Sequence, residues 1–182
     1  EADDWTRWGD PWSRRVESEA QVVAFKTFAV RAVPYDMPII GYGAKTVNRL
    51  RLWQAEPMEN FDFARFDACD YRGAYKAREE AEKISAVLYP NDSADKGRRL
   101  RLMQEYFFTS ASVGDIIDRM LEKEVPLDEF ADRAVMQLND THPVLAVPEL
   151  IRRLEEHGMD FDEAFAVAKK AFAYTNHTVM GE

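Results

Sequence analysis

Two short polar runs carry the residue types that could do chemistry on a small substrate. The first is Asn-Asp-Thr-His-Pro at residues 139–143, and the second is Thr-Asn-His-Thr at residues 175–178. Carboxylate and imidazole groups can hydrogen-bond a polar substrate or exchange protons with it, provided that a concave and mostly dry pocket orients them. Asp140, His142 and His177 are therefore the candidate binding residues.

Each run also has a structural interpretation, which the pattern leaves open. Thr141 could cap a helix that begins near Val144, and the residues do not separate this role from a functional one. His177 could be a packed core histidine with one satisfied ring nitrogen. No metal site is expected, because no third ligand stands at a suitable spacing. A nucleophile triad is not expected either, because the chain has no Gly-x-Ser-x-Gly motif.

Both polar runs come directly after predicted strands. A buried strand is expected at residues 134–138, and a strand-like pair at 173–174. Helices are expected between them at residues 144–157 and 162–171. This alternation predicts an α/β fold with a mostly parallel sheet. Because ligands gather beyond the carboxyl ends of parallel strands, both polar runs should open at one edge of the sheet.

The first half of the chain begins with β-type sequence. Residues 22–34 are expected to form two β segments, with residues 30–33 as the clearest strand. Prolines at positions 34 and 38 and glycines at 41 and 43 then predict a loop. Residues 48–53 alternate polar and apolar side chains, which predicts a further strand.

Two long helices are predicted after these strands. The helix at residues 71–88 has a stripe of small apolar residues that could pack closely on another helix but could not anchor a core. Pro90 ends it, and Asn91, Asp92 and Ser93 begin an exposed loop. The second helix is expected at residues 96–123. Its predicted buried face consists of Leu100, Tyr106, Phe107, Val113, Ile117, Met120 and Leu121.

Composition excludes several classes of partner. The net charge of −9 argues against nucleic acid, because counterion release needs clustered lysine and arginine. No apolar run approaches the roughly 20 residues that span a bilayer. Cys69 is the single cysteine, which excludes an internal disulfide and is expected to be structural. The chain starts at Glu1 without a secretion signal, so we expect a missing natural N-terminus and a cytoplasmic origin.

Seven stretches of the chain resemble the glycogen, starch and maltodextrin phosphorylases, in the order and with similar spacing to that family. They are PYDMP at 34–38, GY at 41–42, RLW at 51–53, VLYPND at 87–92, LRLMQEYF at 100–107, QLNDTHP at 137–143 and AYTNHT at 173–178. The resemblance covers nearly the whole chain, but the chain corresponds to a minor part of a full phosphorylase. We therefore expect an internal piece that ends at Glu182, just after the second polar run.

The resemblance implies a glycosyltransferase that releases glucose 1-phosphate from an α-1,4-glucan with inorganic phosphate and with retention. Such enzymes use pyridoxal phosphate, whose phosphate group serves in proton transfer. They have two Rossmann-like halves of the GT-B type, with the active site between them. This chain resembles part of the N-terminal half, so the cofactor lysine is expected outside it. The chain alone should hold no complete catalytic set and no cofactor or metal site, and it should be inactive.

The resemblance also implies roles for individual residues. His177 matches the histidine that binds the glucose unit near its 6-hydroxyl, while Asp140 and His142 match groups beside the anomeric end. Asn91 and Asp92, followed by Ser93, match a mobile gate loop that closes the site. Many relatives have asparagine where this chain has serine, so no direct sugar contact is expected there. The helix at 71–88 matches the tower helix of the family, through which homodimers form.

Two alternatives from other classes remain open at this point. The chain could be a stand-alone carbohydrate-binding or protein-interaction module, with the helix at 71–88 as its partner surface. It could also be a small enzyme of its own, in which Asp140 and His142 act as acid and base. Binding of maltooligosaccharides by the chain would separate the first alternative from an orphaned half-site.

Overall fold

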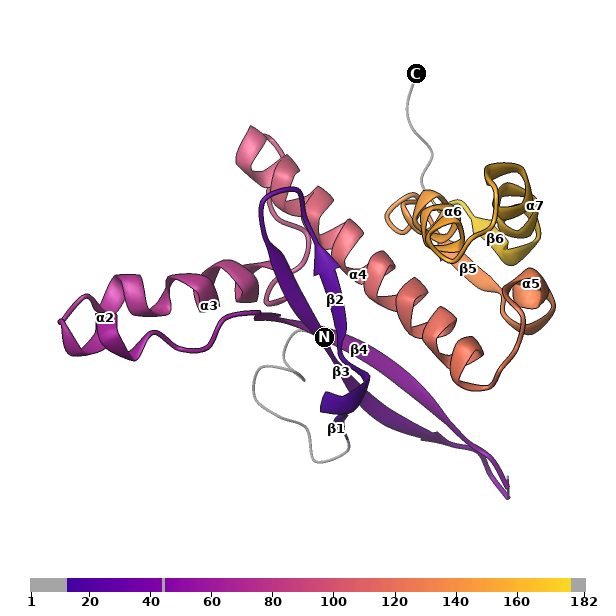
Figure 1. The fold of residues 1–182 in the computed structure, drawn as a ribbon, viewed down its shortest axis with the longest axis horizontal. Coiled ribbons are helices and arrows are strands. Elements are labelled where there is room, and N and C mark those ends of the chain that lie inside the picture. The colour runs from indigo at the N-terminus through magenta and orange to yellow at the C-terminus, as the bar shows by residue number, and fades with distance from the viewer. Residues whose placement is uncertain (1–12, 44, 178–182) are drawn as a thin grey trace. The chain divides into compact units, whose positions relative to one another are not determined.

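A computed structural model describes residues 13–43 and 45–177 of the chain (Figure 1). The chain divides into two compact units, one up to Gln104 and one from Glu105 onward. No helix in these described ranges is both long and apolar enough to cross a membrane.

The first unit contains a four-stranded antiparallel sheet. Its strands are β1 (Arg14–Arg15), β2 (Gln21–Ala24), β3 (Ala29–Ile40) and β4 (Val47–Pro57), and a short 3-10 helix, η1 (Glu17–Glu19), lies between the first two. β4 pairs with β3 from Val30 to Ile40, whereas β2 and β1 pair with successive parts of β3. Figure 1 shows β3 and β4 as a long two-stranded ribbon.

The sheet corrects the expectation of a mostly parallel arrangement. The mixture of helices and strands that defines an α/β composition is confirmed, but every strand pair of this sheet is antiparallel. The connections between β2, β3 and β4 are short hairpins, and parallel neighbours would need crossovers of a dozen or more residues. The short distances along the sequence between these strands could have predicted that they pair in antiparallel order.

The predicted loop begins only after Ile40 and not at residue 34, because β3 continues through Pro34 and Pro38. Gly41 and Gly43 do lie in the connection between β3 and β4. Proline lacks only its N–H, so it disrupts a ladder only on the edge that it faces. The Pro34 carbonyl accepts a hydrogen bond from the Val16 N–H at 2.9 Å, on the edge away from β4. Since backbone groups alternate along a strand, Pro38 faces that same edge. The ladder with β4 therefore stays intact.

A charged cluster covers the middle of this sheet. Asp36 and Arg51 lie directly opposite each other on β3 and β4, and Arg51 Nε and Nη2 both donate to the Asp36 carboxylate at 2.6 Å. Arg49 Nη1 donates to the same carboxylate at 3.0 Å, and Glu19 lies 2.7 Å from Arg51 Nη2. Burial acts to raise the pKa of Asp36, but the hydrogen bonds and charges of Arg51 and Arg49 outweigh it and lower that pKa.

Replacing Arg51 by methionine should destabilise the chain by about 2 kcal/mol, because a largely buried Asp36 carboxylate then loses its two-pronged partner. Urea denaturation at neutral pH measures this loss. The matched control is Arg49→Met, which removes a more exposed arginine from the same carboxylate and should cost less than about 1 kcal/mol. Equal losses in the two variants would contradict the assignment of Arg51 as the main partner.

Helices complete the first unit. α2 (Phe63–Asp67) is followed by α3 (Tyr71–Ser85), whose N-cap Asp70 accepts a hydrogen bond from the Gly73 N–H at 3.0 Å. α3 ends three residues before the predicted end at 88 and buries Ala74, Ala81 and Ile84, so the stripe of small residues is confirmed. The Ser85 hydroxyl accepts a hydrogen bond from the Ala55 N–H at 2.9 Å, which ties the end of α3 to β4.

The long helix α4 (Asp95–Glu122) agrees with the prediction to within one residue at each end. Of its predicted buried face, Phe107, Val113, Ile117 and Met120 are buried. Leu100 and Tyr106 are half-buried. Leu121 is exposed, which corrects the prediction for that residue. The buried face of α4 runs through Val113, Ile117 and Met120, and Leu121 lies outside this face.

The second unit places a small parallel sheet beside helices (Figure 1). Its elements, in addition to the end of α4, are η2 (Leu127–Glu129), α5 (Phe130–Arg133), β5 (Met136–Asn139), α6 (Ala146–Glu156), α7 (Phe161–Ala171) and β6 (Phe172–Thr175). β5 and β6 are parallel neighbours, as the alternating pattern predicted. Their core comprises apolar residues from α4 to α7, including Phe130, Leu138, Leu150 and Leu154.

Candidate functional site

The two predicted polar runs meet at the carboxyl ends of β5 and β6. Asn139 lies opposite Thr175 at the last rung of the parallel pair. The Asp140 N–H donates to the Thr175 carbonyl at 2.7 Å, and Gln137 Nε2 donates to the Thr175 hydroxyl at 2.6 Å. The expectation that both runs open at one edge of a sheet is thus confirmed for the described residues 139–143 and 175–177.

His177 lies at this shared edge and contacts the first polar run directly. Its Nε2 is in hydrogen-bond contact with the side-chain oxygen of Asn139, 38 residues earlier in the chain. The His177 side chain is exposed, so its interpretation as a packed core histidine is wrong. Thr178, the last residue of the run, lies outside the described residues.

Asp140 occupies a strained and buried turn. Its φ is +66°, in the left-handed region that few residues other than glycine, asparagine and aspartate adopt. The residue is only 7% exposed, and its Oδ1 accepts a hydrogen bond from the Thr141 N–H at 2.8 Å. Backbone strain that a fold maintains is common at functional sites.

Thr141 does not cap the helix that follows. The N-cap of α6 is Leu145, which makes no side-chain capping bond, and Thr141 contributes its carbonyl as the acceptor for the Val144 N–H at 3.1 Å. The capping interpretation is therefore wrong. The first polar run instead forms a tight turn, in which Asp140 is buried and His142 is partly exposed.

His142 follows in the same turn and remains partly accessible. Its Nδ1 lies 3.8 Å from Glu105 Oε1 of α4, and 41% of its side chain is exposed. The carboxylate of Glu105 therefore can steady the ring without covering it.

The second unit also contains a buried ionic cluster around Glu149, which sequence reasoning missed. Glu149 of α6 is 3% exposed, and its Oε1 accepts hydrogen bonds from the Ser110 hydroxyl at 2.7 Å, Arg152 Nη2 at 2.8 Å and Arg153 Nε at 3.1 Å. Burial acts to raise the pKa of Glu149, but the hydrogen bonds from Arg152, Ser110 and Arg153 outweigh it and lower that pKa. One sequence signal could have revealed this cluster: Glu149 falls on the apolar face of a helix, and arginines follow it three and four residues later.

The predicted gate residues lie in the first unit, between α3 and α4. Asn91 Oδ1 accepts a hydrogen bond from the Ser93 N–H at 2.9 Å, which makes a tight local turn. Asp92 Oδ2 lies 2.8 Å from Arg101 Nη1 of α4. These contacts hold the loop in place without occupying the side chain of Ser93, which is exposed.

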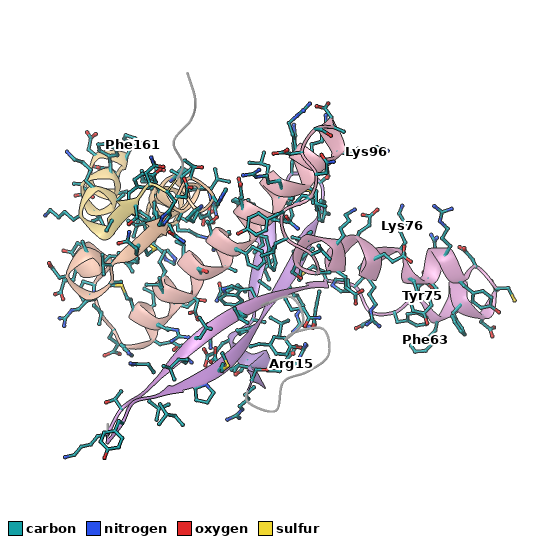
Figure 2. All side chains as sticks on the ribbon, turned by 180° about the vertical axis from the view of Figure 1, so that it is seen from behind. Arg15, Phe63, Tyr75, Lys76, Lys96 and Phe161 are labelled. Carbon is teal, nitrogen blue, oxygen red and sulfur yellow. The ribbon has the colours of Figure 1, made fainter. Side chains whose placement is uncertain are left out.

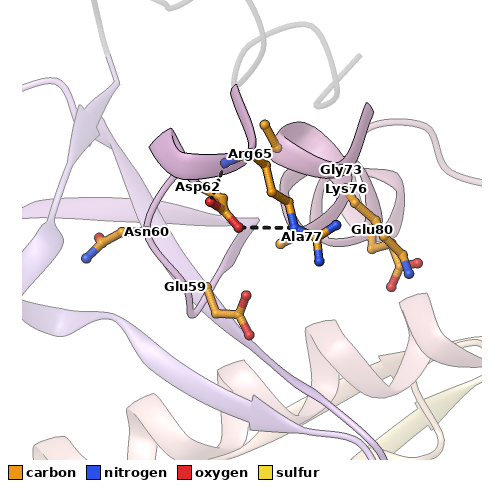
Figure 3. A pocket seen from close by; sticks show the side chains of 9 residues that line it. Glu59, Asn60, Asp62, Arg65, Gly73, Lys76, Ala77 and Glu80 are labelled. Carbon is orange, nitrogen blue, oxygen red and sulfur yellow. Dashed lines mark hydrogen bonds and ion pairs between the residues drawn. The ribbon is translucent and has the colours of Figure 1, made fainter. Parts of the chain in front are cut away.

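The first unit also contains a shallow charged pocket that includes none of the predicted site residues (Figure 3). Its volume is about 290 Å³. Arg65 lies 3.2 Å from the Asp62 carboxylate at its rim, and Lys76 and Glu80 line the α3 side (Figure 3). Its lining combines three carboxylates, on Glu59, Asp62 and Glu80, with two cations, on Arg65 and Lys76. Within residues 13–43 and 45–177, no three metal-ligating side chains cluster closely enough to hold an ion.

The sequence of this chain is similar to those of known proteins. The family model for carbohydrate phosphorylases matches residues 1–182. Glycogen phosphorylase of Saccharomyces cerevisiae is 49% identical over 154 residues, which cover 84% of this chain and 17% of the yeast protein. Glycogen phosphorylase of Synechocystis is 45% identical over 154 residues, with 84% and 18% covered.

The brain form of glycogen phosphorylase from Rattus norvegicus is 42% identical over 205 residues, which cover the whole of this chain and 24% of the rat protein. The chain thus spans less than a quarter of the curated relatives that it matches. The region that the family model matches includes the two polar runs that follow β5 and β6, and also the loop before α4. Because the family model covers every residue of it, this chain belongs to the carbohydrate phosphorylase family.

Proposed function

We propose that this chain contributes the glucose-binding part of the N-terminal, Rossmann-like half of an α-1,4-glucan phosphorylase in the cytoplasm. The observation that carries the proposal is the parallel pairing of β5 and β6, which brings Asp140 and His177 to one edge of a sheet. The names of the relatives support the same activity, since the proteins matched are glycogen phosphorylases. The reaction transfers the terminal glucose of an α-glucan to inorganic phosphate.

Each residue at the edge has a distinct role in this proposal. The exposed imidazole of His177, steadied by Asn139, hydrogen-bonds a hydroxyl of the bound glucose. The buried Asp140 carboxylate lies toward the anomeric end, where it stabilises the positive charge that develops in an oxocarbenium-like transition state. His142 completes the lining of the same end. Asn91 and Asp92, in the first unit, are assigned to a gate loop in this proposal.

The chain's own lysines do not fit attachment of pyridoxal phosphate. A lysine that forms a Schiff base is activated by desolvation or by a neighbouring cation, whereas every lysine of this chain is exposed. When bound to the intact enzyme, the cofactor would supply the phosphate group for proton transfer. Its attachment lysine therefore belongs outside these 182 residues in the proposal.

The proposed partner is a second copy of the protein, which docks through α3. The α2–α3 region carries a cluster of aromatic rings around Phe61, whose ring centroid lies 5.0 Å from those of Phe63 and Tyr75. Phe63 and Tyr71 are largely exposed, and Figure 2 shows Phe63 and Tyr75 close together on one side of α3. Aromatic groups of this kind are enriched at protein interfaces.

The direct test measures phosphate-dependent formation of glucose 1-phosphate. The gene product that carries these residues should release it from maltooligosaccharide, and omission of phosphate should abolish the release. The 182-residue chain by itself should form none, because it lacks a lysine that fits the cofactor. Release by the chain alone, or the absence of release from the longer gene product with pyridoxal phosphate present, would overturn the proposal. Tight maltooligosaccharide binding by the chain alone would favour a carbohydrate-binding module instead.

A further inference from the structure

The segment between α3 and α4 lies directly against the first turns of α4, and Gly97 makes this approach possible. A Cβ atom on Gly97 would lie 1.7 Å from the Asn91 carbonyl oxygen and 2.7 Å from its carbonyl carbon. Neither atom can yield as a flexible side chain would, because both belong to the backbone. Glycine at position 97 is therefore a requirement of the observed loop position.

The side chain of Arg98 binds backbone atoms of the same segment. Its Nη1 donates to the carbonyl oxygens of Asp92 and Ser93 at 3.2 and 3.4 Å, and its Nη2 donates to Asp95 Oδ1 at 2.6 Å. The planar guanidinium can make these contacts at once, whereas a lysine ammonium offers only a point charge. One side chain thus joins two successive carbonyl groups of the loop to the first turn of α4.

Arg101, one turn later on α4, binds the same segment through the side chain of Asp92. Its Nη1 lies 2.8 Å from the Asp92 carboxylate, which is itself about half exposed. Asp92 is therefore restrained at its carbonyl by Arg98 and at its carboxylate by Arg101. Such exposed contacts are individually weak, so the segment can leave α4 at a modest cost in free energy.

The chain enters this segment through a strained residue. Tyr89 has a φ of +56° immediately before Pro90. A left-handed conformation is unfavourable for a tyrosine and persists only where surrounding contacts maintain it. Release of the loop from α4 would permit Tyr89 to return to an ordinary extended conformation. The contacts at Gly97, Arg98 and Arg101 thus oppose a local tendency to open.

We propose that Gly97, Arg98 and Arg101 form a latch on α4 that positions Asn91 and Asp92 and sets how readily the loop opens. The inference deepens the proposed function, on which the role of the loop at the sugar rests. Arg98 and Arg101 are positioning residues here, since they act through the loop. The latch consists of the loop backbone packed against Gly97 and of guanidinium contacts from Arg98 and Arg101. None of these contacts involves a substrate.

Hydrogen exchange of the amides of residues 91–95 tests the latch without an activity assay. In the protein that carries these residues, Arg98→Gln and Arg101→Gln should each speed this exchange about 2- to 5-fold. Arg101→Lys should recover part of the protection. The matched control is Arg99→Gln, because Arg99 is an exposed arginine on the same turns with no ion pair among the described residues. Its exchange should be unchanged.

Gly97→Ala is the more discriminating variant, because its expected effect on helix stability and its expected effect on the loop have opposite signs. Within an exposed helix, alanine in place of glycine normally increases stability. Here the added methyl group must displace the loop, so exchange at residues 91–95 should rise about tenfold or more while α6 and β5 keep their protection. Unchanged loop exchange in both Gly97→Ala and Arg101→Gln would overturn the latch.

The kinetic readout separates the latch from the proposed activity. In an active phosphorylase, Arg101→Gln should raise the KM for glucan about 2- to 5-fold with little change in kcat, since a loosened loop weakens closure. A merely destabilised enzyme would lose active molecules, and so kcat, at constant KM, which would contradict the positioning role. Faster loop exchange in a protein that makes no glucose 1-phosphate would refute the activity and leave the latch intact.

Discussion

Replacing Asp140 by asparagine should lower kcat/KM for phosphorolysis about 100-fold in the intact enzyme. The change removes one negative charge from a residue that is 7% exposed and alters little else. Asparagine tolerates the φ of +66°, and its side-chain oxygen can still accept the Thr141 N–H. The backbone hydrogen bond to Thr175 does not involve the side chain. A loss of activity would therefore report on charge and not on folding.

Two comparisons make the Asp140 test decisive. Asp128→Asn removes a charge from an exposed position at η2 and should leave kcat/KM within about twofold of the unmodified enzyme. Asp140→Ala should reduce stability as well as activity, because alanine is strained in the left-handed region. An Asp140→Asn enzyme with unchanged kcat and normal stability would show that this carboxylate serves only the turn.

The second large effect concerns the stability of the second unit. Glu149→Gln should destabilise the chain by about 2–3 kcal/mol, below the usual loss for a fully buried pair because Arg152 is half exposed. The variant leaves the Ser110 hydroxyl and two arginines with a neutral acceptor in place of a carboxylate. Urea denaturation at pH 7 provides the measurement. Glu155→Gln, at an exposed position of the same helix, should change stability by less than about 0.5 kcal/mol.

The pH dependence of this effect has a definite sign. The folded-state pKa of Glu149 is lowered from the ordinary value of 4.5, so its carboxylate contributes full stability above that value. The contribution disappears as the pH falls through the lowered folded-state pKa. The stability difference between the unmodified chain and Glu149→Gln should therefore shrink below pH 4.5. A difference that grows in acid would contradict the assignment.

Sequence patterns predicted the longer helices of the second unit well, and also that its two polar runs would share one edge of a sheet. α4 and α7 begin and end within one residue of their predicted bounds, because apolar periodicity and local capping specify them. Asp160 and Glu163, for example, form a capping box at the start of α7. The order of strand, helix, helix and strand likewise predicted that β5 and β6 would be parallel neighbours.

The same approach failed where an outcome depends on a partner far along the chain. The prolines of β3 were interpreted as a loop because the sequence does not say which edge of a strand will carry a neighbour. Glu149 was missed because its Ser110 partner lies 39 residues earlier. The contact of Gly97 with the Asn91 backbone was missed for a related reason, since glycine in a helix usually signals weakness and not close packing.

The amino-acid sequence by itself determined the family, the helices, and the two polar runs that follow β5 and β6, because each depends on residues that are close together in the chain. Only the tertiary structure decided that β3 passes through its prolines, that Asn139 meets His177, and that Asp140 is buried in a strained turn. These outcomes depend on the register between distant strands and on which backbone groups water can reach. Local residue preferences contain neither quantity.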